Sequence, residues 1–216
     1  HFDKEKQICI VEPGMVLDQL NNFLKPYGLW FPIDVSTSSR ATIGGMAGNN
    51  SCGGRSIKYG MMRDNVLSID AILNDGNEYN FGKLENINFL RNNKINIFEK
   101  TVSELLDLAE ENQDEILKKF PKVLRRVGGY NIDALLPDAM SLRPNGKKGD
   151  GINLSHLLVG SEGTLNYFTA ITLKLSPLPS EKVMGVCHFP TFYEAMNAAQ
   201  HLVTLNPVAV ELIDKT

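Results

Sequence analysis

The residues best suited to chemistry lie in one segment of the chain, PIDVSTSSRATIGGMAGNNSCGGRSIKY, which runs from Pro32 to Tyr59. This glycine-rich segment holds five glycines among short hydroxyl and amide side chains. Glycine accepts a positive φ and lets the backbone approach another molecule closely, and consecutive backbone N–H groups attract anions. These residue types therefore favour contact between the backbone and a flat or charged ligand.

An irregular loop built from turn-forming residues is the alternative interpretation of this segment. The length of the segment argues against it, because structureless connections this long in compact domains are mostly functional or disordered. An apolar thread that would attach the segment to a core runs through Pro32, Ile33, Val35, Ile43, Met46 and Ala47. We therefore predict a ligand-binding loop, in which Gly44 and Gly45 present consecutive N–H groups to a pyrophosphate or a ring carbonyl.

The polar groups of the segment indicate an organic cofactor rather than a metal. Asn49, Asn50 and Ser51 offer uncharged, directional hydrogen bonds, which suit a ligand with rings and phosphates. The segment has no cluster of histidines or carboxylates, and the three cysteines of the chain form no CxxC pair. We predict no metal site. A GxGxxG motif after a first strand and a GxxxxGK[ST] motif are absent, which disfavours a Rossmann dehydrogenase and a P-loop enzyme.

A second glycine motif, GSEGTL, spans Gly160 to Leu165. Its Glu162 could be a base, a carboxylate that binds a ribose, or a simple turn residue. The motif is weak by itself and gains strength beside the first one. In the glycine-rich segment, Cys52 could be a covalent flavin tether or a redox thiol. A small space-filling residue is the simpler interpretation, because only Arg55 and Lys58 stand near it to lower the pKa of its thiol.

Composition narrows the range of partners. The chain has 216 residues and a net charge of −3, with scattered basic residues, so no electrostatic feature predicts a nucleic-acid partner. A low, odd number of cysteines fits a reducing compartment. We expect a cytoplasmic protein, with a peripheral position at the inner face of the membrane as a further option. No apolar run approaches the length that spans a membrane.

Hydrophobic periodicity predicts the elements that position these motifs. Alternating residues predict strands over 7–12, 65–73 and 167–175, and a hairpin returns over 78–81. Helical spacing predicts a helix from Leu17 to Tyr27 that Gly28 ends. It leads to a short strand over 29–31, in which Trp30 is either a buried anchor or a surface that stacks on an aromatic ligand.

Two further helices follow, and the end of the chain has a different pattern. One helix opens at a capping box of Thr101 with Glu104, and the next at Asp114, while residues 85–100 are interpreted as a surface excursion. Residues 140–152 form a polar insertion. After a Pro-rich linker, strands over 183–189 and 208–213 flank a helix that Thr191 and Glu194 open, which is a β-α-β unit. We therefore predict one domain over 1–178 and the start of a second over 179–216.

Three segments together resemble a known family. They are PIDVSTSSRATIGGMAGNNSCGGRSIKYG, RRVGGYNIDALLPD and HLLVGSEGTLNYFTAITLKLSPLP. In this order they resemble the FAD-linked oxidases of the vanillyl-alcohol oxidase type, which have a PCMH-type FAD-binding domain. Within the family they are most similar to the flavin parts of bacterial D-2-hydroxyacid dehydrogenases for D-lactate, glycolate and D-2-hydroxyglutarate, in the branch often fused to an iron–sulfur domain. The motifs are specific for the family and much less so for the substrate.

The resemblance implies an α+β fold. It predicts the second subdomain of the FAD-binding domain, a mixed or antiparallel sheet flanked by helices, followed by the first β-α-β of a ferredoxin-like substrate domain. The family's RGxGT-type loop lies upstream of the opening strand, and its catalytic His and Glu lie well downstream. We therefore expect a fragment that lacks the catalytic residues and turnover, and that binds FAD weakly or not at all by itself.

The resemblance also implies a set of cofactor-binding residues. The first group would line the flavin edge, the second would lie against the isoalloxazine, ribityl and pyrophosphate, and the third would close over the other end of the cofactor. The groups are Pro32, Ser36, Thr37 and Ser39; then Thr42, Gly44, Gly45, Asn49, Asn50, Ser51 and Gly53; then Glu162, Gly163 and Thr164.

The activity implied for the parent protein is oxidation of a D-2-hydroxyacid to a 2-oxoacid by hydride transfer to flavin N5. Its electrons would pass to an iron–sulfur domain or subunit, a quinone or a cytochrome. Two alternatives stay open: a flavin-free binding or scaffold fragment of the same fold, and an FAD-dependent alkyl-transfer enzyme. If the two glycine motifs lay far apart in the folded chain, the flavoprotein interpretation would fail.

Overall fold

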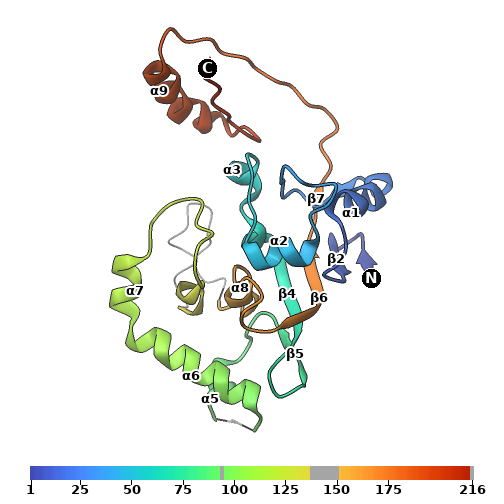
Figure 1. Cartoon of the computed structure of the whole chain (residues 1–216), viewed down its shortest axis with the longest axis vertical. Helices are drawn as coiled ribbons and strands as arrows, with labels where there is room; N and C mark the ends of the chain where they lie inside the picture. Colours follow the sequence, from blue (N-terminus) through green and yellow to red (C-terminus); the bar gives the residue numbers. More distant parts are fainter. Residues whose placement is uncertain (93–94, 137–150, 215–216) are drawn as a thin grey trace.

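The computed structural model describes residues 1–92, 95–136 and 151–214. Its centre is a five-stranded antiparallel sheet with the strand order β1-β2-β6-β4-β5 (Figure 1). The four strands predicted from alternation for this sheet are confirmed to within one residue at each end. The strands are β1 Phe2–Asp3, β2 Ile8–Val11, β4 Val66–Ile72, β5 Glu78–Phe81 and β6 Tyr167–Lys174.

One face of this sheet forms the floor of the core. Successive side chains of a strand point to opposite faces, so alternate residues of neighbouring strands meet on the same side. Ile171 of β6 pairs with Ile69 of β4 and with Val11 of β2, and all three side chains are buried. A register shift between Val66 and Ser68 adjusts the start of β4. Strands β4 and β6 pair with each other inside the sheet, which explains why their strand pattern is the clearest in the sequence.

The first helix connects the sheet to the glycine-rich segment. Helix α1, Leu17–Leu24, buries Leu17, Leu20 and Leu24 and continues into the 3-10 helix η1, Lys25–Tyr27. Gly28 ends this element in the left-handed region at φ 72°, as predicted. Strand β3, Leu29–Trp30, then pairs with β7, Ser176–Pro177, in a separate two-stranded sheet.

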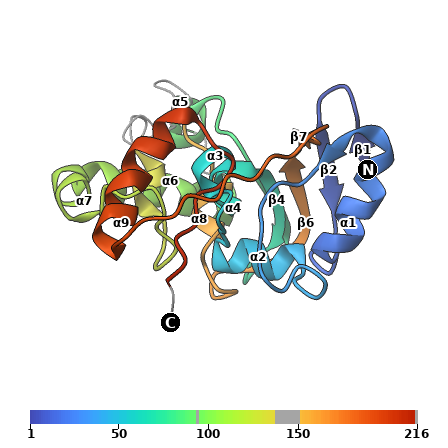
Figure 2. The ribbon, with the colours of Figure 1, turned by 90° about the horizontal axis from the view of Figure 1, so that it is seen from above.

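The predicted loop over the glycine-rich segment is wrong in part, because three short helices form within or just after it. They are α2 Ile43–Asn49, α3 Ser56–Tyr59 and α4 Met62–Asn65. The apolar thread is the physical reason for α2, since Ile43, Met46 and Ala47 are buried on one side of it. Figures 1 and 2 show α2 beside β4 and β6.

Four helices and a short 3-10 helix lie beyond β4 and β5, on the side of the sheet away from β2 (Figure 1). Helix α6 begins after Asn96, which forms a capping box with Glu99, so the predicted start at Thr101 and Glu104 is wrong. The predicted surface excursion over 85–100 is also wrong, because α5 and the first turn of α6 lie within it. The elements are α5 Ile87–Asn92, α6 Ile97–Glu111, α7 Gln113–Lys119, η2 Ile132–Leu135 and α8 Ser155–Leu158. The polar insertion over 140–152 lies largely outside the described residues.

Residues 179–214 form an arm that leaves the sheet (Figure 1). The predicted helix is present as α9, Phe192–Leu202, with Thr191 accepting a hydrogen bond from the Glu194 N–H, and η4, Val203–Leu205, follows. The strands predicted over 183–189 and 208–213 are not formed in the described part of the chain. A strand needs hydrogen bonds from a neighbouring strand, and here Val183 is 97% exposed. No helix among the described residues is both long and apolar enough to cross a membrane.

Candidate functional site

The N-terminus of α2 is closed by hydrogen bonds within the protein. Thr42 precedes the helix, and its side-chain oxygen accepts from the Gly45 N–H at 3.2 Å. The Ile43 and Gly44 N–H groups donate to the carbonyl oxygens of Met15 and Pro13, both at 2.8 Å. The prediction that Gly44 and Gly45 offer consecutive free N–H groups to a pyrophosphate is therefore wrong, because both groups already have partners.

The two glycines nevertheless have different surroundings. A Cβ on Gly44 would lie 2.5 Å from Pro13 Cβ and 2.9 Å from the Pro13 carbonyl oxygen, so only glycine fits there. A Cβ on Gly45 would meet only the Thr42 hydroxyl, at 3.2 Å, and Gly45 is exposed. Gly45 lies four residues before the exposed Asn49, which places both on one face of α2. On that face the backbone at Gly45 is accessible, because no side chain covers it.

The end of α2 contacts the second glycine motif. The Gly160 N–H donates to the Ala47 carbonyl at 2.9 Å, and the Glu162 N–H donates to the Gly48 carbonyl at 3.0 Å. The side-chain amide of Asn49 also donates to Glu162 Oε1 at 2.9 Å. We call this junction, residues 48–49 with 160–164, the glycine corner. The requirement that the two motifs meet is therefore confirmed.

The turn in the glycine corner adopts an unusual backbone conformation. Glu162 has φ 53° and Gly163 has φ 72°, both in the left-handed region. Only glycine adopts this region freely, so the conformation of Glu162 must be stabilised by its contacts. The bonds to Gly48 and Asn49 supply that stabilisation. Of the three roles left open for Glu162, the turn role is visible in this geometry, and its carboxylate is exposed and bonded to an amide.

The remaining predicted site residues take several positions. Asn49, Glu162, Gly163 and Thr164 meet in the glycine corner, and the Ser51 hydroxyl donates to Asn49 Oδ1 at 3.4 Å. Pro32 is buried, whereas Ser36, Thr37 and Ser39 are exposed on a turn that meets the start of α1 through the Asp18 N–H bond to the Ser38 carbonyl. Gly53 has no room for a side chain, because a Cβ would lie 2.4 Å from Asp34.

Asn50 is fully buried and uses its side chain inside the protein. Its Nδ2 donates to the Arg126 carbonyl at 3.2 Å, and its Oδ1 accepts from the Arg63 N–H at 3.0 Å. It also adopts the left-handed region at φ 53°, which ends α2. The structure thus assigns Asn50 to the joint between α2, α4 and the loop before η2.

A third segment joins the glycine corner that the motif-based site prediction did not include. The Tyr130 hydroxyl lies 2.7 Å from Thr164 Oγ1. The next residue, Asn131, is buried and donates to the carbonyl oxygens of His156 and Val159 at 3.1 and 2.7 Å. The glycine pair in RRVGGYN was the sequence signal that could have indicated this contact.

Trp30 is a buried anchor, as the simpler interpretation held. It is 7% exposed, with the Arg55 guanidinium 4.7 Å above its ring and Tyr59 edge-on at 5.7 Å. Its position fixes the base of the glycine-rich segment rather than a stacking surface.

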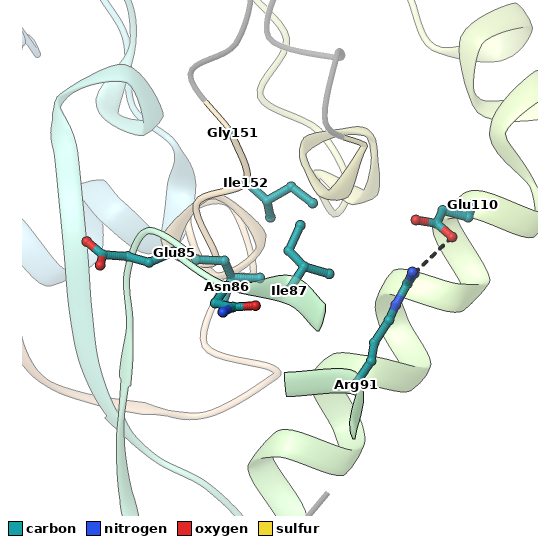
Figure 3. Close-up of a pocket in the computed structure, with 8 residues that line it drawn as sticks. Glu85, Asn86, Ile87, Arg91, Glu110, Gly151 and Ile152 are labelled. Atoms are coloured by element: carbon teal, nitrogen blue, oxygen red, sulfur yellow. Dashed lines mark ion pairs between the residues drawn. The ribbon is translucent and has the colours of Figure 1, made fainter. Parts of the chain in front are cut away.

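A cavity of about 410 Å³ lies elsewhere, beside the loop from Leu84 to Ile87 (Figure 3). Ile152 points into it, and Arg91 forms an ion pair with Glu110 at its edge, at 2.8 Å. None of its lining residues belongs to the predicted site, so the cavity is not the place where the motifs converge. Within the described ranges, no group of His, Cys, Asp or Glu side chains could hold a metal ion.

Comparison with known proteins agrees with this geometry. Residues 1–82 match the family model of an FAD binding domain. The chain is 32% identical over 218 aligned residues to D-2-hydroxyglutarate dehydrogenase of Pantoea ananatis, covering 99% of this chain and 20% of that protein. It is also 29% identical to D-lactate dehydrogenase of Archaeoglobus fulgidus, covering 99% of this chain and 34% of that protein.

The chain is similar to the FAD-linked oxidases, and its residues 1–82 match an FAD binding domain. It spans about a fifth of the length of the D-2-hydroxyglutarate dehydrogenases that it matches. Among solved structures it resembles an alkyldihydroxyacetonephosphate synthase with a TM-score of 0.54 and 19% identity, over 96% of this chain and 26% of that one. That likeness concerns the fold alone. It agrees with the predicted α+β, PCMH-type domain, whose sheet is antiparallel in the described strands.

The matching family model is that of an FAD binding domain, and the glycine corner fits such a ligand. Gly163 has no atom within 4 Å of an added Cβ, and Gly45 has only the Thr42 hydroxyl, so backbone is accessible on both sides of the corner. Ser161 is 1% exposed, and its hydroxyl has no hydrogen-bond partner in the described part of the chain. Accessible backbone, an unsatisfied buried hydroxyl and uncharged donors match a ring system with polar edges.

Proposed function

We propose that the chain is the FAD-binding part of a dehydrogenase that oxidises a D-2-hydroxyacid to a 2-oxoacid. The observation that carries the proposal is the glycine corner, where the Glu162 N–H donates to the Gly48 carbonyl and unites two distant glycine motifs. D-2-hydroxyglutarate is the first candidate substrate, because D-2-hydroxyglutarate dehydrogenases are among the relatives that match at 30 to 32% identity. D-lactate and glycolate follow, from relatives at 25 to 29% identity.

The residues of this chain would bind and orient the cofactor. Bound FAD supplies a flavin ring that accepts a hydride from the substrate. On the protein side, accessible backbone at Gly45 and Gly163 would admit a flat ring, and the amide of Asn49 would remain fixed by Glu162. The exposed hydroxyls of Ser36, Thr37 and Ser39 would contact the edge of the ligand. None of these groups is cationic, so positioning is their contribution.

The base that takes the hydroxyl proton is proposed to lie in another part of the parent protein, since this chain spans about a fifth of its relatives. Electrons would leave to an iron–sulfur domain or subunit, a quinone or a cytochrome. The relative in Arabidopsis thaliana is named for a cytochrome acceptor, which supports the last option. A cytoplasmic location, or one at the inner face of the membrane, is part of the same proposal.

An FAD-dependent alkyl transfer is the second candidate function. The likeness to an alkyldihydroxyacetonephosphate synthase favours it, although that likeness concerns only the fold. A flavin-free scaffold is the third candidate. Oxidation of each hydroxyacid delivers two electrons to the flavin as a hydride, whereas an alkyl transfer is redox-neutral overall, and a scaffold would hold no flavin.

Anaerobic addition of the hydroxyacids to the purified parent protein separates these functions. We expect a flavin absorbance near 450 nm, as is usual for oxidised flavin, and its bleaching by D-2-hydroxyglutarate. The L enantiomer is the matched control. A bound flavin that none of D-2-hydroxyglutarate, D-lactate and glycolate bleaches would contradict the dehydrogenase proposal, and a colourless protein that does not take up added FAD would favour the scaffold.

A further inference from the structure

The loop that precedes η2 contacts the glycine corner through one side chain. The Tyr130 hydroxyl lies 2.7 Å from Thr164 Oγ1, and Thr164 Oγ1 lies 2.6 Å from the Ser161 carbonyl oxygen. Tyr130 and Thr164 are 34 residues apart in sequence. The contact therefore joins a separate loop to the turn that contains Glu162 and Gly163.

The chemistry of the three groups fixes the direction of both hydrogen bonds. A carbonyl oxygen can only accept, so the Thr164 hydroxyl donates its single hydrogen to Ser161. The Thr164 oxygen is then an acceptor, and Tyr130 must donate its phenolic hydrogen to it. The two bonds form a chain, Tyr130 to Thr164 to Ser161, in which each bond polarises the next.

The backbone next to Tyr130 is fixed by Asn131, whose side chain makes all the hydrogen bonds that it can. Asn131 is 2% exposed, and its amide donates to the His156 and Val159 carbonyls. Its Oδ1 accepts from Arg63 at 2.6 Å and from Arg126 at 3.1 Å. All four hydrogen-bonding positions of the Asn131 side chain are thus used. Tyr130 itself stays 48% exposed, so an exposed ring stands on a fixed backbone.

We propose that Tyr130 is a positioning residue of the FAD site. By donating to Thr164 it holds the turn of the glycine corner in the conformation that presents Gly163 to the cofactor. Glu162 and Gly163 both have positive φ, and for Glu162 this conformation is unfavourable without external bonds. Tyr130 supplies one such bond from outside the turn. This inference rests on the proposed FAD-binding function and names a residue that the motifs did not.

Tyr130→Phe tests the inference, because it removes the hydroxyl and keeps the ring. Tyr27→Phe is the matched control, since Tyr27 is 42% exposed and lies in an aromatic cluster with Phe2 and Phe23 far along the chain from the corner. Two measurements are made: amide hydrogen exchange of residues 162–164 without FAD, and the dissociation constant of FAD with its visible circular dichroism. Thr164→Ser keeps the hydroxyl and serves as the conservative variant.

In Tyr130→Phe we expect faster exchange at these amides, about fivefold weaker FAD binding, as for loss of one hydrogen bond, and an altered flavin dichroism. Tyr27→Phe should match the wild type in both measurements, and Thr164→Ser, which keeps the hydroxyl, should leave the exchange of these amides slow. In a Thr164→Val background, Tyr130→Phe should add little, because its partner is already gone. Wild-type exchange and affinity in Tyr130→Phe would overturn the inference. The FAD titrations use the parent protein. Failure of the wild-type parent protein to bind FAD would overturn the proposed function, while the exchange measurement would still decide whether Tyr130 holds the turn.

Discussion

The side-chain amide of Asn49 donates a 2.9 Å hydrogen bond to Glu162 Oε1, which joins two residues 113 positions apart in sequence. Both side chains are exposed, so the bond adds little to the stability of the fold. Its effect is to fix the distance between the end of α2 and the turn of the second glycine motif. Because this bond lies at the surface where the two motifs meet, we expect it to contribute to ligand binding.

Asn49→Ala should therefore separate binding from stability. We expect about fivefold weaker FAD binding, from loss of one hydrogen bond, and a change in the free energy of unfolding below about 0.5 kcal/mol. Fluorescence titration with FAD and urea denaturation measure the two quantities. Asn22→Ala, at an exposed asparagine of α1, is the control and should change neither. Equal FAD affinity in Asn49→Ala and the wild type would contradict this role.

The two adjacent glycines of α2 should respond oppositely to alanine. Gly44→Ala brings a Cβ to 2.5 Å from Pro13 Cβ, so we expect a loss of unfolding free energy of about 2 kcal/mol. Gly45→Ala has room and gains helix propensity of up to about 1 kcal/mol, so the fold should be as stable as the wild type or more so. Its added methyl group should nevertheless weaken FAD binding, and Gly45→Val should abolish it. Denaturation and FAD titration check both variants, with Gly14→Ala, which has open space, as control. Undiminished FAD binding in Gly45→Val would show that this face of α2 does not contact the cofactor.

Asn131→Ala should be among the most destabilising polar substitutions in the chain. It leaves the His156 and Val159 carbonyls without their donor and removes an acceptor from Arg63, whose side chain is 4% exposed. We expect a loss of about 3 kcal/mol of unfolding free energy, measured by urea denaturation. Asn77→Ala, in the exposed hairpin turn, should cost less than about 1 kcal/mol. A similar small loss for both variants would mean that the buried bonds of Asn131 contribute little.

Much of the fold could be predicted because buried and exposed side chains alternate along the strands of the sheet. Strands β2, β4 and β6 alternate clearly, since one face is buried at Cys9, Ile69 and Ile171. Helix α2 was missed because three of its seven residues are glycines, whose low helix propensity hides the pattern. Its bonds to Pro13 and Met15 come from a turn distant in sequence and offset that propensity.

The start of α6 was misplaced for a similar reason. Both Asn96 with Glu99 and Thr101 with Glu104 match a capping pattern. Phe98 decides between them, because it stacks on Tyr79 at 4.9 Å and meets Phe81 edge-on at 5.0 Å, so the helix starts early enough to include it. Contacts between elements of this kind are not visible in local periodicity.

The candidate site, like the fold, could be predicted only in part from the sequence. The sequence predicted that the two glycine motifs meet, because they share a ligand type. It did not reveal that Asn50 faces inward or that Tyr130 joins the corner, since both facts depend on how the loop before η2 packs. The roles of the predicted cofactor contacts remain predictions for the binding experiments.

Stability should depend on alkaline pH through Cys9. Burial raises the pKa of the Cys9 thiol from 9.0 to about 11, and the charge of the N-terminus opposes this slightly. The folded state thus holds the proton more tightly than the unfolded state. The free energy of unfolding that the protonated thiol contributes is therefore fully present below pH 9 and is lost between about pH 9 and 11. We expect a loss of about 2 to 3 kcal/mol over that range by urea denaturation. Cys9→Ala should show a shallower decline, and an identical decline in both proteins would contradict the assignment.

Chemical-shift mapping during an FAD titration is the most direct test that the glycine corner is one flavin site. The backbone amides of Gly45, Asn49, Gly163 and Thr164 should shift together and follow one saturation curve. Shifts limited to one of the two motifs, or centred on the cavity beside residues 84–87, would contradict the account.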